Sequence, residues 1–244
     1  EFTRIVASAG WSYKWGVQQQ RSQHRIDLLD INYLYMPSID QTFKEDYLEK
    51  DENYILKYNY EDRFIVRTGY SYIYNSAGRA LMNNSGIGNS YTIRLNFESA
   101  GNLLYAVAKL GGMKKNASGE YTLLNIPFAQ YLKGDFDFAK NLVIDNRNSL
   151  AFHFGAGIAI PYGNATMLPF EKRYFSGGAN SVRAFSARSI GPGSYAPDKE
   201  NKYSFINHVG DIRMEANVEY RFRIIGDLHG AVFLDAGNVW LMRK

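Results

Sequence analysis

The chain of 244 residues contains no cysteine, and this absence excludes disulfide frameworks, thiolate zinc sites and cysteine nucleophiles. No apolar run reaches about 18 residues, so we expect no transmembrane helix. The net charge of +4 is a small excess for a chain of this length. Because it gives little attraction to a polyanion, we predict no nucleic-acid partner.

Conventional catalytic and cofactor patterns are also scarce. The histidines are far apart and have no metal-ligand spacing, so we predict no metal site; they are His24, His153, His208 and His229. Asp135 and Asp137 could pair as acid and base, but two solvated carboxylates beside Lys133 are the favoured interpretation. The glycine pairs, such as Gly177-Gly178, lack the lysine and the strand-to-helix context of a phosphate loop. We therefore predict no cofactor and no enzymatic activity in this chain.

What the sequence has is aromatic residues and alternation. Its 19 Tyr, 15 Phe and 3 Trp exclude a disordered chain. Apolar and polar residues alternate with period two in about eight segments, which indicates β-strands. The segments are residues 5–15, 29–35, 64–74, 91–98, 132–138, 150–160, 212–223 and 230–236.

The length of these segments favours a membrane barrel over a soluble sheet. Strands of globular sandwiches are commonly about 5–6 residues long, whereas about 9–11 residues cross a bilayer at a tilt. Long strands with one apolar and one charged face are typical of a barrel with a polar lumen. Aromatic residues near strand ends fit interfacial girdles, as at Trp11, Trp15, Tyr33, Tyr35, Tyr72, Tyr74 and Trp240. A soluble β-sandwich binding module remains the alternative.

The connections between the strands are of two kinds. Short turns are expected at residues 18–23, 145–148 and 225–228, and long loops at residues 38–61, 101–120 and 163–210. This alternation is typical of tight periplasmic turns and long outer loops, although residues 75–89 form an unusually long turn. Within the long loops we predict helices at residues 40–50 and 102–110.

The most informative segment is the loop at residues 163–210. It contains the pair Gly177-Gly178 and then Val182-Arg183, a pattern that turns tightly and presents one cation. If this loop folds into the lumen, Arg183 requires carboxylate or carbonyl partners. The next two strands offer inward-facing carboxylates in Glu219 and Asp235.

These residues resemble the BamA/TamA-type outer-membrane assembly barrels, or bacterial surface-antigen family. That family has a long loop with a glycine pair and a Val/Ile-Arg-Gly-Phe/Tyr tip, and this chain has Val182-Arg183-Ala184-Phe185. The resemblance extends to Glu219 and to residues 233–240, and residues 11–32 are similar to a lipidated branch found in Bacteroidetes. It implies that Arg183 anchors the loop and that Glu219 and Asp235 hold it. Ala184 departs from the glycine of the family, and a positive φ there would cost about 1 kcal/mol.

The resemblance also implies an architecture. The fold is an all-β, antiparallel transmembrane β-barrel of sixteen strands, of which this chain supplies about eight, the sixth to the thirteenth. Residues 1–244 would then be part of one C-terminal β-barrel domain, with the periplasmic POTRA domains and the last strands outside the sequence. Because an incomplete sheet has open edges, we expect them to pair with another copy or another chain.

The function implied is assembly or insertion of proteins in the outer membrane of a Gram-negative bacterium. Its partners would be outer-membrane lipid, nascent outer-membrane proteins as clients, and the POTRA domains of the same chain. Client strands would add at a lateral seam by edge pairing. Two alternatives stay open: a polypeptide-secretion pore or diffusion channel, and the membrane anchor of an upstream enzyme domain.

Overall fold

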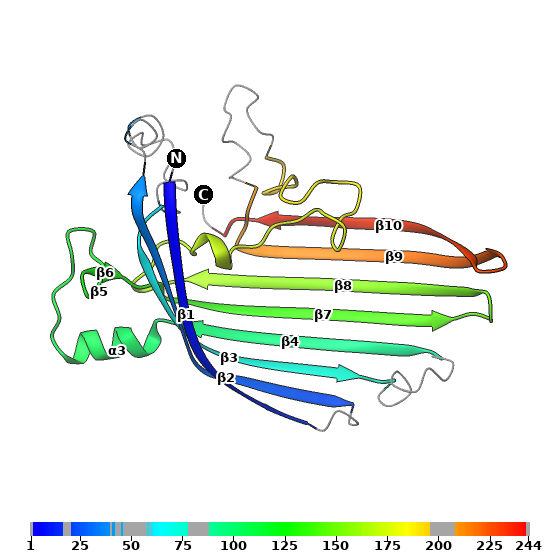
Figure 1. Ribbon diagram of the computed structural model, residues 1–244, viewed down its shortest axis with the longest axis horizontal. Helices are drawn as coiled ribbons and strands as arrows, with labels where there is room; N and C mark the ends of the chain where they lie inside the picture. Colours follow the sequence, from blue (N-terminus) through cyan, green and yellow to red (C-terminus); the bar gives the residue numbers. More distant parts are fainter. Residues whose placement is uncertain are drawn as a thin grey trace.

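The computed structural model describes residues 2–16, 21–39, 41, 45, 58, 60–77, 88–195 and 208–242. Its main feature is one antiparallel sheet of eight strands, each hydrogen-bonded to its neighbours along the chain (Figure 1). The strands are β1 (Phe2–Trp15), β2 (Ser22–Ile39), β3 (Arg63–Asn75), β4 (Ser90–Ala100), β7 (Tyr131–Val143), β8 (Asn148–Pro161), β9 (Ile212–Ile225) and β10 (Leu228–Trp240). The prediction of eight long antiparallel strands is confirmed.

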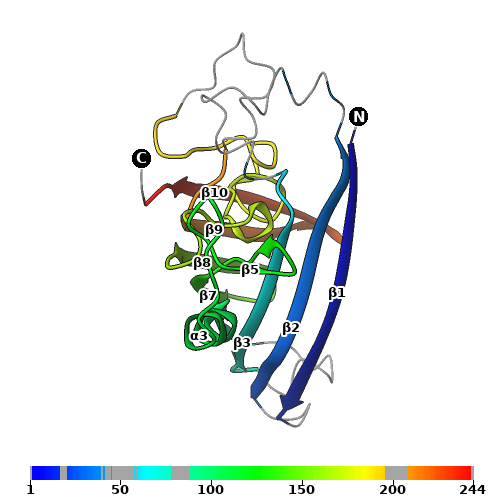
Figure 2. The ribbon, with the colours of Figure 1, turned by 90° about the vertical axis from the view of Figure 1, so that its left-hand side faces the viewer.

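The sheet is curved and open. Figure 2 shows β1, β2 and β3 sweeping away from the strands β7 to β10, so that the sheet has a concave and a convex face. β1 and β10 lie at the two ends of the strand order, and within the described residues they do not pair with each other. Each therefore leaves one row of backbone hydrogen-bonding groups without a strand partner in this sheet.

A β-bulge in β2 explains why its first half escaped the alternation pattern. Asp27 pairs with Gly69 of β3, but the next pair is Asp30 with Arg67, so two residues of β2 oppose one of β3. The pairing of β2 with β1 shifts at the same place. Without the extra residue, Asp27 and Asp30 would lie on opposite faces, because side chains alternate along a strand. The bulge brings both carboxylates to the concave face.

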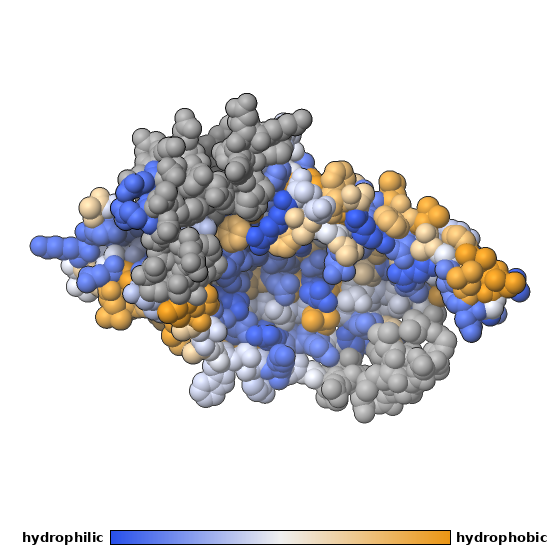
Figure 3. Space-filling view, turned by 45° about the horizontal axis from the view of Figure 1, so that its top comes forward, coloured by the Kyte–Doolittle hydropathy of each residue, from blue (hydrophilic) through white to orange (hydrophobic). Residues whose placement is uncertain are grey.

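Burial on the two faces is the reverse of that in a soluble sheet. On β9, the convex-face residues Met214 and Val218 are 47% and 38% exposed, whereas Glu215 between them is only 3% exposed. In Figure 3, hydrophilic side chains gather across the middle of the molecule and hydrophobic ones lie toward its margins. Charged residues inside and apolar residues outside fit a barrel wall with lipid on its convex face.

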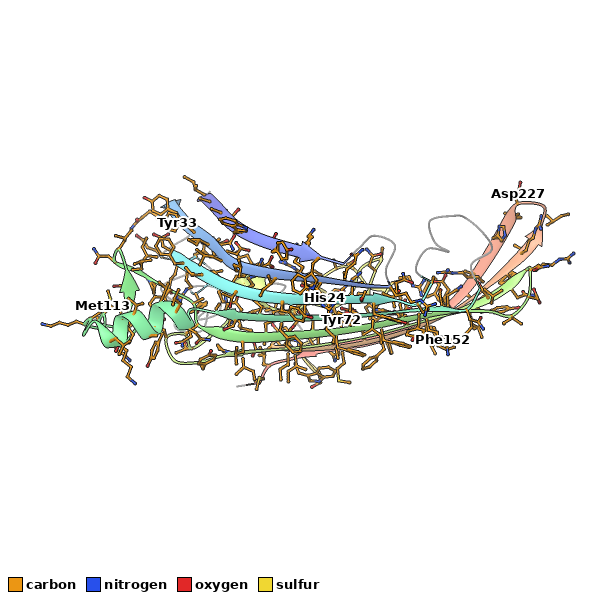
Figure 4. All side chains as sticks on the ribbon, turned by 90° about the horizontal axis from the view of Figure 1, so that it is seen from below. His24, Tyr33, Tyr72, Met113, Phe152 and Asp227 are labelled. Carbon is orange, nitrogen blue, oxygen red and sulfur yellow. The ribbon has the colours of Figure 1, made fainter. Side chains whose placement is uncertain are left out.

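Aromatic side chains lie near both ends of the first three strands. The rings of Trp15 and His24 stack with centroids 5.1 Å apart, and Tyr72 lies 5.0 Å from His24. At the other end, Tyr33 stacks on Phe64 at 4.8 Å. Figure 4 shows Tyr33 well separated from His24 and Tyr72 along the strands. This spacing is the arrangement expected of two interfacial girdles.

The long connection between β4 and β7 has structure of its own. It contains α3 (Asn102–Leu110), as predicted, and a small hairpin of β5 (Thr122–Leu123) and β6 (Ile126–Pro127), which the alternation pattern did not predict. The other predicted helix, at residues 40–50, lies outside the described residues except for positions 41 and 45. Among the residues that the structure describes, no helix has the length and apolar character needed to cross a membrane.

The assignment of the convex face to lipid predicts a depth-dependent cost of charge. Val218→Arg, at the middle of β9, should lower the free energy of unfolding from the bilayer by about 2–4 kcal/mol. The matched change Phe222→Arg, nearer the short turn, should cost about 0–1 kcal/mol. Urea titration of the parent protein in phospholipid vesicles measures both values. Equal, small costs at the two positions would contradict a lipid-facing surface.

Candidate functional site

The candidate site is the long loop after β8, called here the motif loop (residues 163–210, described as 163–195 and 208–210). It includes the short 3-10 helix η4 (Phe170–Lys172). Tyr174 and Gly210 exchange two backbone hydrogen bonds of 2.9 and 2.8 Å and so close the base of the loop. A side chain at 210 would lie 2.7 Å from the carbonyl oxygen of Trp240, so the close approach to β10 requires glycine there. From this base the loop runs along the concave face toward β9 and β10 (Figure 1).

The tip of the loop is a tight turn that depends on the glycine pair. Gly177 and Gly178 have φ values of 98° and 95°, a region that favours glycine. A Cβ atom at Gly177 would lie 2.3 Å from the carbonyl oxygen of Ser186. The backbone N–H of Gly178 donates to the carbonyl of Phe185 at 2.8 Å and closes the turn. Ala184 is not among the described residues with positive φ, so the strain that a left-handed conformation would impose does not arise.

The turn delivers Arg183 to two strands. Nε and Nη2 of Arg183 donate to Oδ2 and Oδ1 of Asp235 on β10, each at 2.8 Å, and its backbone N–H donates to Oδ2 at 3.0 Å. Nη1 donates to Oε2 of Glu219 on β9. The guanidinium also lies over the ring of Phe233, 3.8 Å from its centroid. One arginine thus bridges the two strands through a bidentate contact and a second carboxylate.

Strand register places both carboxylates under the tip. Glu219 pairs with Phe233 and Asn217 pairs with Asp235, so all four side chains share the concave face. Asn217 donates from Nδ2 to Asp235 at 2.9 Å and to the carbonyl of Ser181 at 2.8 Å. A slip of one residue would turn this whole set to the lipid face. Hydrogen bonds from Arg183 to Asp235 and Glu219 raise the pKa of the guanidinium, and the arginine stays charged.

The base of the loop makes a second set of contacts that the sequence did not predict. Nζ of Lys172 lies 2.7 Å from Oε1 of Glu98 on β4. The hydroxyl of Tyr174 donates to Oδ1 of Asp135 on β7 at 2.7 Å. Burial, and then the hydrogen bond to Asp135, raise the pKa of the Tyr174 hydroxyl, so it remains a proton donor. The motif loop is therefore tied to the middle of the sheet as well as to β9 and β10.

Gly157 on β8 makes room for the Tyr174 ring. A Cβ atom there would lie 2.6 Å from Cζ of Tyr174 and 2.7 Å from its hydroxyl oxygen. Nζ of Lys133 lies 4.1 Å from the centroid of the same ring. The alternation pattern showed Gly157 as an inward position without a side chain, and this was the available signal that something packs against the wall.

The contacts of Glu98 continue across the sheet. Besides Lys172, Glu98 accepts hydrogen bonds from Nη1 of Arg67 at 3.0 Å and from the hydroxyl of Tyr131. Arg67 on β3 also pairs with Asp30 of β2, and its Nη1 lies 3.9 Å from Asp27. The charges on the concave faces of β2, β3 and β4 thus form one network that ends at the motif loop.

The remaining sequence candidates have structural partners. Asp135 is partly exposed and accepts a hydrogen bond from Tyr174, a partner that the interpretation as a solvated carboxylate did not include. Asp137 lies 3.5 Å from Nε2 of His153, whose Nδ1 lies 2.8 Å from Oδ1 of Asn217. Within the described residues no group of three or more His, Asp or Glu side chains is placed to hold a metal ion.

A cavity of about 430 Å³ lies between the tip and the wall of the sheet, next to the anchor. Its lining includes Thr92, His153, Asn180, Arg183, Asn217 and Arg221. The motif loop therefore leaves open space between its tip and β4, β7 and β8.

Two arginines contact Glu219, and we expect their removal to reduce the stability of the protein by different amounts. Arg183→Ala leaves Asp235, whose side chain is 4% exposed, without its cation, and should lower the free energy of unfolding by about 1–3 kcal/mol. Arg221 is 55% exposed, and Arg221→Ala should cost less than about 1 kcal/mol. Chemical denaturation of the parent protein in detergent or bilayer compares them. Equal losses of unfolding free energy in the two variants would contradict the expectation that Arg183 contributes more to stability than Arg221.

The packing of Tyr174 on Gly157 predicts a coupled pair. Gly157→Ala should lower the free energy of unfolding by about 1–3 kcal/mol, because the new methyl group displaces the ring of Tyr174. The cost should largely vanish in a Tyr174→Ala background, which removes the ring. Gly155→Ala is the control, since its Cβ would lie at 3.3 Å or more from its neighbours. A double-mutant cycle from unfolding curves checks the coupling, and strict additivity would exclude the contact.

Comparison with known proteins places this geometry in a family. The sequence model of the Omp85 superfamily domain matches residues 2–243. Over 89 residues the chain is 30% identical to the outer membrane protein assembly factor BamA of Neisseria meningitidis serogroup B, an alignment that covers 34% of this chain and 11% of that protein. The crystal structure of BamA from Haemophilus ducreyi lacking POTRA domains 1–3 is similar with a TM-score of 0.62 and 17% identity, covering 99% of this chain and 43% of that one.

These matches confirm the resemblance to BamA/TamA-type barrels, whereas the similarity to a Bacteroidetes branch stays a prediction. The chain spans well under two thirds of the length of either relative. The family match covers nearly the whole sequence, and the strand order and inverted burial agree with it. The chain belongs to the Omp85 superfamily, and its sheet is part of an antiparallel β-barrel in the outer membrane of a Gram-negative bacterium.

Proposed function

We propose that this chain is the barrel portion of a factor that assembles or inserts proteins in the outer membrane. The observation that carries the proposal is the motif loop bound to the concave wall through Arg183, Glu219 and Asp235, in a chain that belongs to the Omp85 superfamily. Similarity to the assembly factor BamA of Neisseria meningitidis supports the same function. No covalent reaction is part of the proposal, because the work is binding and guided strand pairing.

The role proposed for Arg183 is to anchor the motif loop, with Glu219 and Asp235 as its carboxylate partners and Gly177, Gly178, Val182, Ala184 and Phe185 shaping the turn. Val182 is 4% exposed, and its Cγ2 would lie 2.9 Å from a Cβ atom at Gly237 of β10. The tip of the motif loop therefore makes van der Waals contacts as well as hydrogen bonds with the concave wall. A loop held in this way keeps the lumen wall of β4 to β10 in one curvature while the rest of the barrel changes shape.

The rest of the parent protein belongs to the proposal too. We place the eight strands as the sixth to thirteenth of a sixteen-strand barrel in the C-terminal domain of a longer chain, preceded by POTRA domains. The open edges of β1 and β10 then pair with strands of the same barrel or with a second copy. Nascent outer-membrane proteins are the clients, and outer-membrane lipid surrounds the convex face.

The test uses the intact parent protein in phospholipid vesicles and an unfolded outer-membrane barrel protein as client. Wild type should accelerate client folding over empty vesicles, measured by protease protection. Arg183→Ala should lower the initial rate several-fold at equal amounts of folded protein, whereas Arg221→Ala should leave it near wild type. Protease digestion of the variants in parallel shows that the barrel itself is intact.

The outcomes separate the function from the role of the loop. No acceleration by wild type, together with a large single-channel conductance, would replace assembly with transport. Full acceleration by wild type and by Arg183→Ala alike would leave the assembly function and reject the anchor role.

A further inference from the structure

α3 leaves an apolar surface uncovered at the outer end of the barrel. Its packed face holds Leu104, Tyr105 and Ala108, and Ala108 is buried. Its other face is also apolar. Leu103, Val107 and Leu110 are 65%, 58% and 89% exposed, with the spacing i, i+4 and i+7 of one helical face. A short helix that is apolar on both sides normally has both sides covered. We therefore expect another molecule or surface to cover the exposed face.

The direction of α3 is fixed by the chain around it. Gly101 has φ 73°, and a Cβ atom there would lie 2.2 Å from the carbonyl oxygen of Ala129. The side chain of Asn102 accepts hydrogen bonds from Gln130 at 2.9 Å and from the hydroxyl of Tyr162 at 2.7 Å. The helix therefore starts at the rim of β7 and β8 in a set orientation, and it projects beyond the end of β4 (Figure 1).

The charges on and after α3 indicate what kind of surface covers its exposed face. Residues 101–119 contain Lys109, Lys114 and Lys115 and no acidic residue. All three lysines are exposed, as is Met113 at 44%, and Nζ of Lys115 lies 5.2 Å from the centroid of the Tyr121 ring. Figure 4 shows Met113 at the end of α3 that lies farthest from the strands. Exposed apolar side chains next to cations, without anions, fit an interfacial helix on an anionic membrane surface.

The position of α3 also supports a membrane surface as what covers its exposed face. The convex face of the wall below α3 is apolar up to Phe97 on β4 and Leu132 on β7, which are 56% and 48% exposed. α3 follows β4 after Gly101 alone, so the helix begins directly beyond the end of this apolar surface. The long loops mark this end as the outer one.

We propose that α3 and the segment after it, residues 102–115, bind the outer leaflet of the membrane. Leu103, Val107, Leu110 and Met113 enter the boundary between headgroups and acyl chains, and Lys109, Lys114 and Lys115 contact the phosphate groups of anionic lipid. This surface tethers the β4–β7 connection to the membrane and keeps it away from the mouth of the barrel. The proposal does not depend on the assembly function.

The absence of cysteine from the chain allows a direct test. Leu110→Cys carries an environment-sensitive fluorophore in the intact parent protein, with any cysteine outside this chain replaced by serine. Ser118→Cys, an exposed turn position in the same connection, is the matched control. The proteins are reconstituted in phosphatidylcholine vesicles with or without about one third phosphatidylglycerol, and quenching by nitroxide lipids and by aqueous iodide is compared.

The proposal predicts that nitroxide lipids quench the label at Leu110 at least about threefold more than the label at Ser118, and that anionic lipid increases the difference. Lys109→Gln with Lys114→Gln and Lys115→Gln should abolish that increase, whereas Arg147→Gln at the opposite end should not. Iodide quenching of both labels alike would overturn the proposal, because the helix would face water. Protection of Leu110 from both quenchers would also overturn it, since a protein segment would then cover the helix.

Discussion

The structure depends on one constraint: the charges of the sheet lie on its concave face, where they must find partners within the protein. Glu98, Glu215 and Asp235 are all held there by hydrogen bonds to other side chains. An isolated buried carboxylate would be costly, so each strand needs a cation or a hydroxyl from a neighbour or from the motif loop. The bulge in β2 serves the same requirement, because it turns Asp27 and Asp30 toward Arg67.

The motif loop meets this requirement at two separate places. Arg183 pairs with carboxylates of β9 and β10. Lys172 and Tyr174 contact carboxylates of β4 and β7. The two contact sets are joined by a loop base that is itself hydrogen-bonded at Tyr174 and Gly210. A movement of the loop would therefore expose carboxylates at both places together. The side-chain contacts that hold the loop to the wall at these two places are polar and charged.

The convex side is stabilised by its surroundings. Its apolar residues are exposed in the isolated chain, as expected of a surface that faces lipid, and aromatic rings lie near both ends of the first three strands. The exposed face of α3 is the same kind of surface carried beyond the sheet on a helix, with lysines in place of the aromatic girdle. Strands and helix thus use one principle of apolar exposure to lipid at different depths.

The sequence by itself determined the strands, their two faces and the tip of the motif loop, because side-chain alternation and a glycine pair are local properties. The family resemblance of this motif, together with the inward carboxylates on the next two strands, also indicated Arg183, Glu219 and Asp235. Only the tertiary structure decided that Tyr174 packs on Gly157, that Lys172 binds Glu98, and that the bulge in β2 aligns two aspartates. These contacts join residues 17 to 74 positions apart, and their geometry depends on strand register and sheet curvature, which no local pattern encodes.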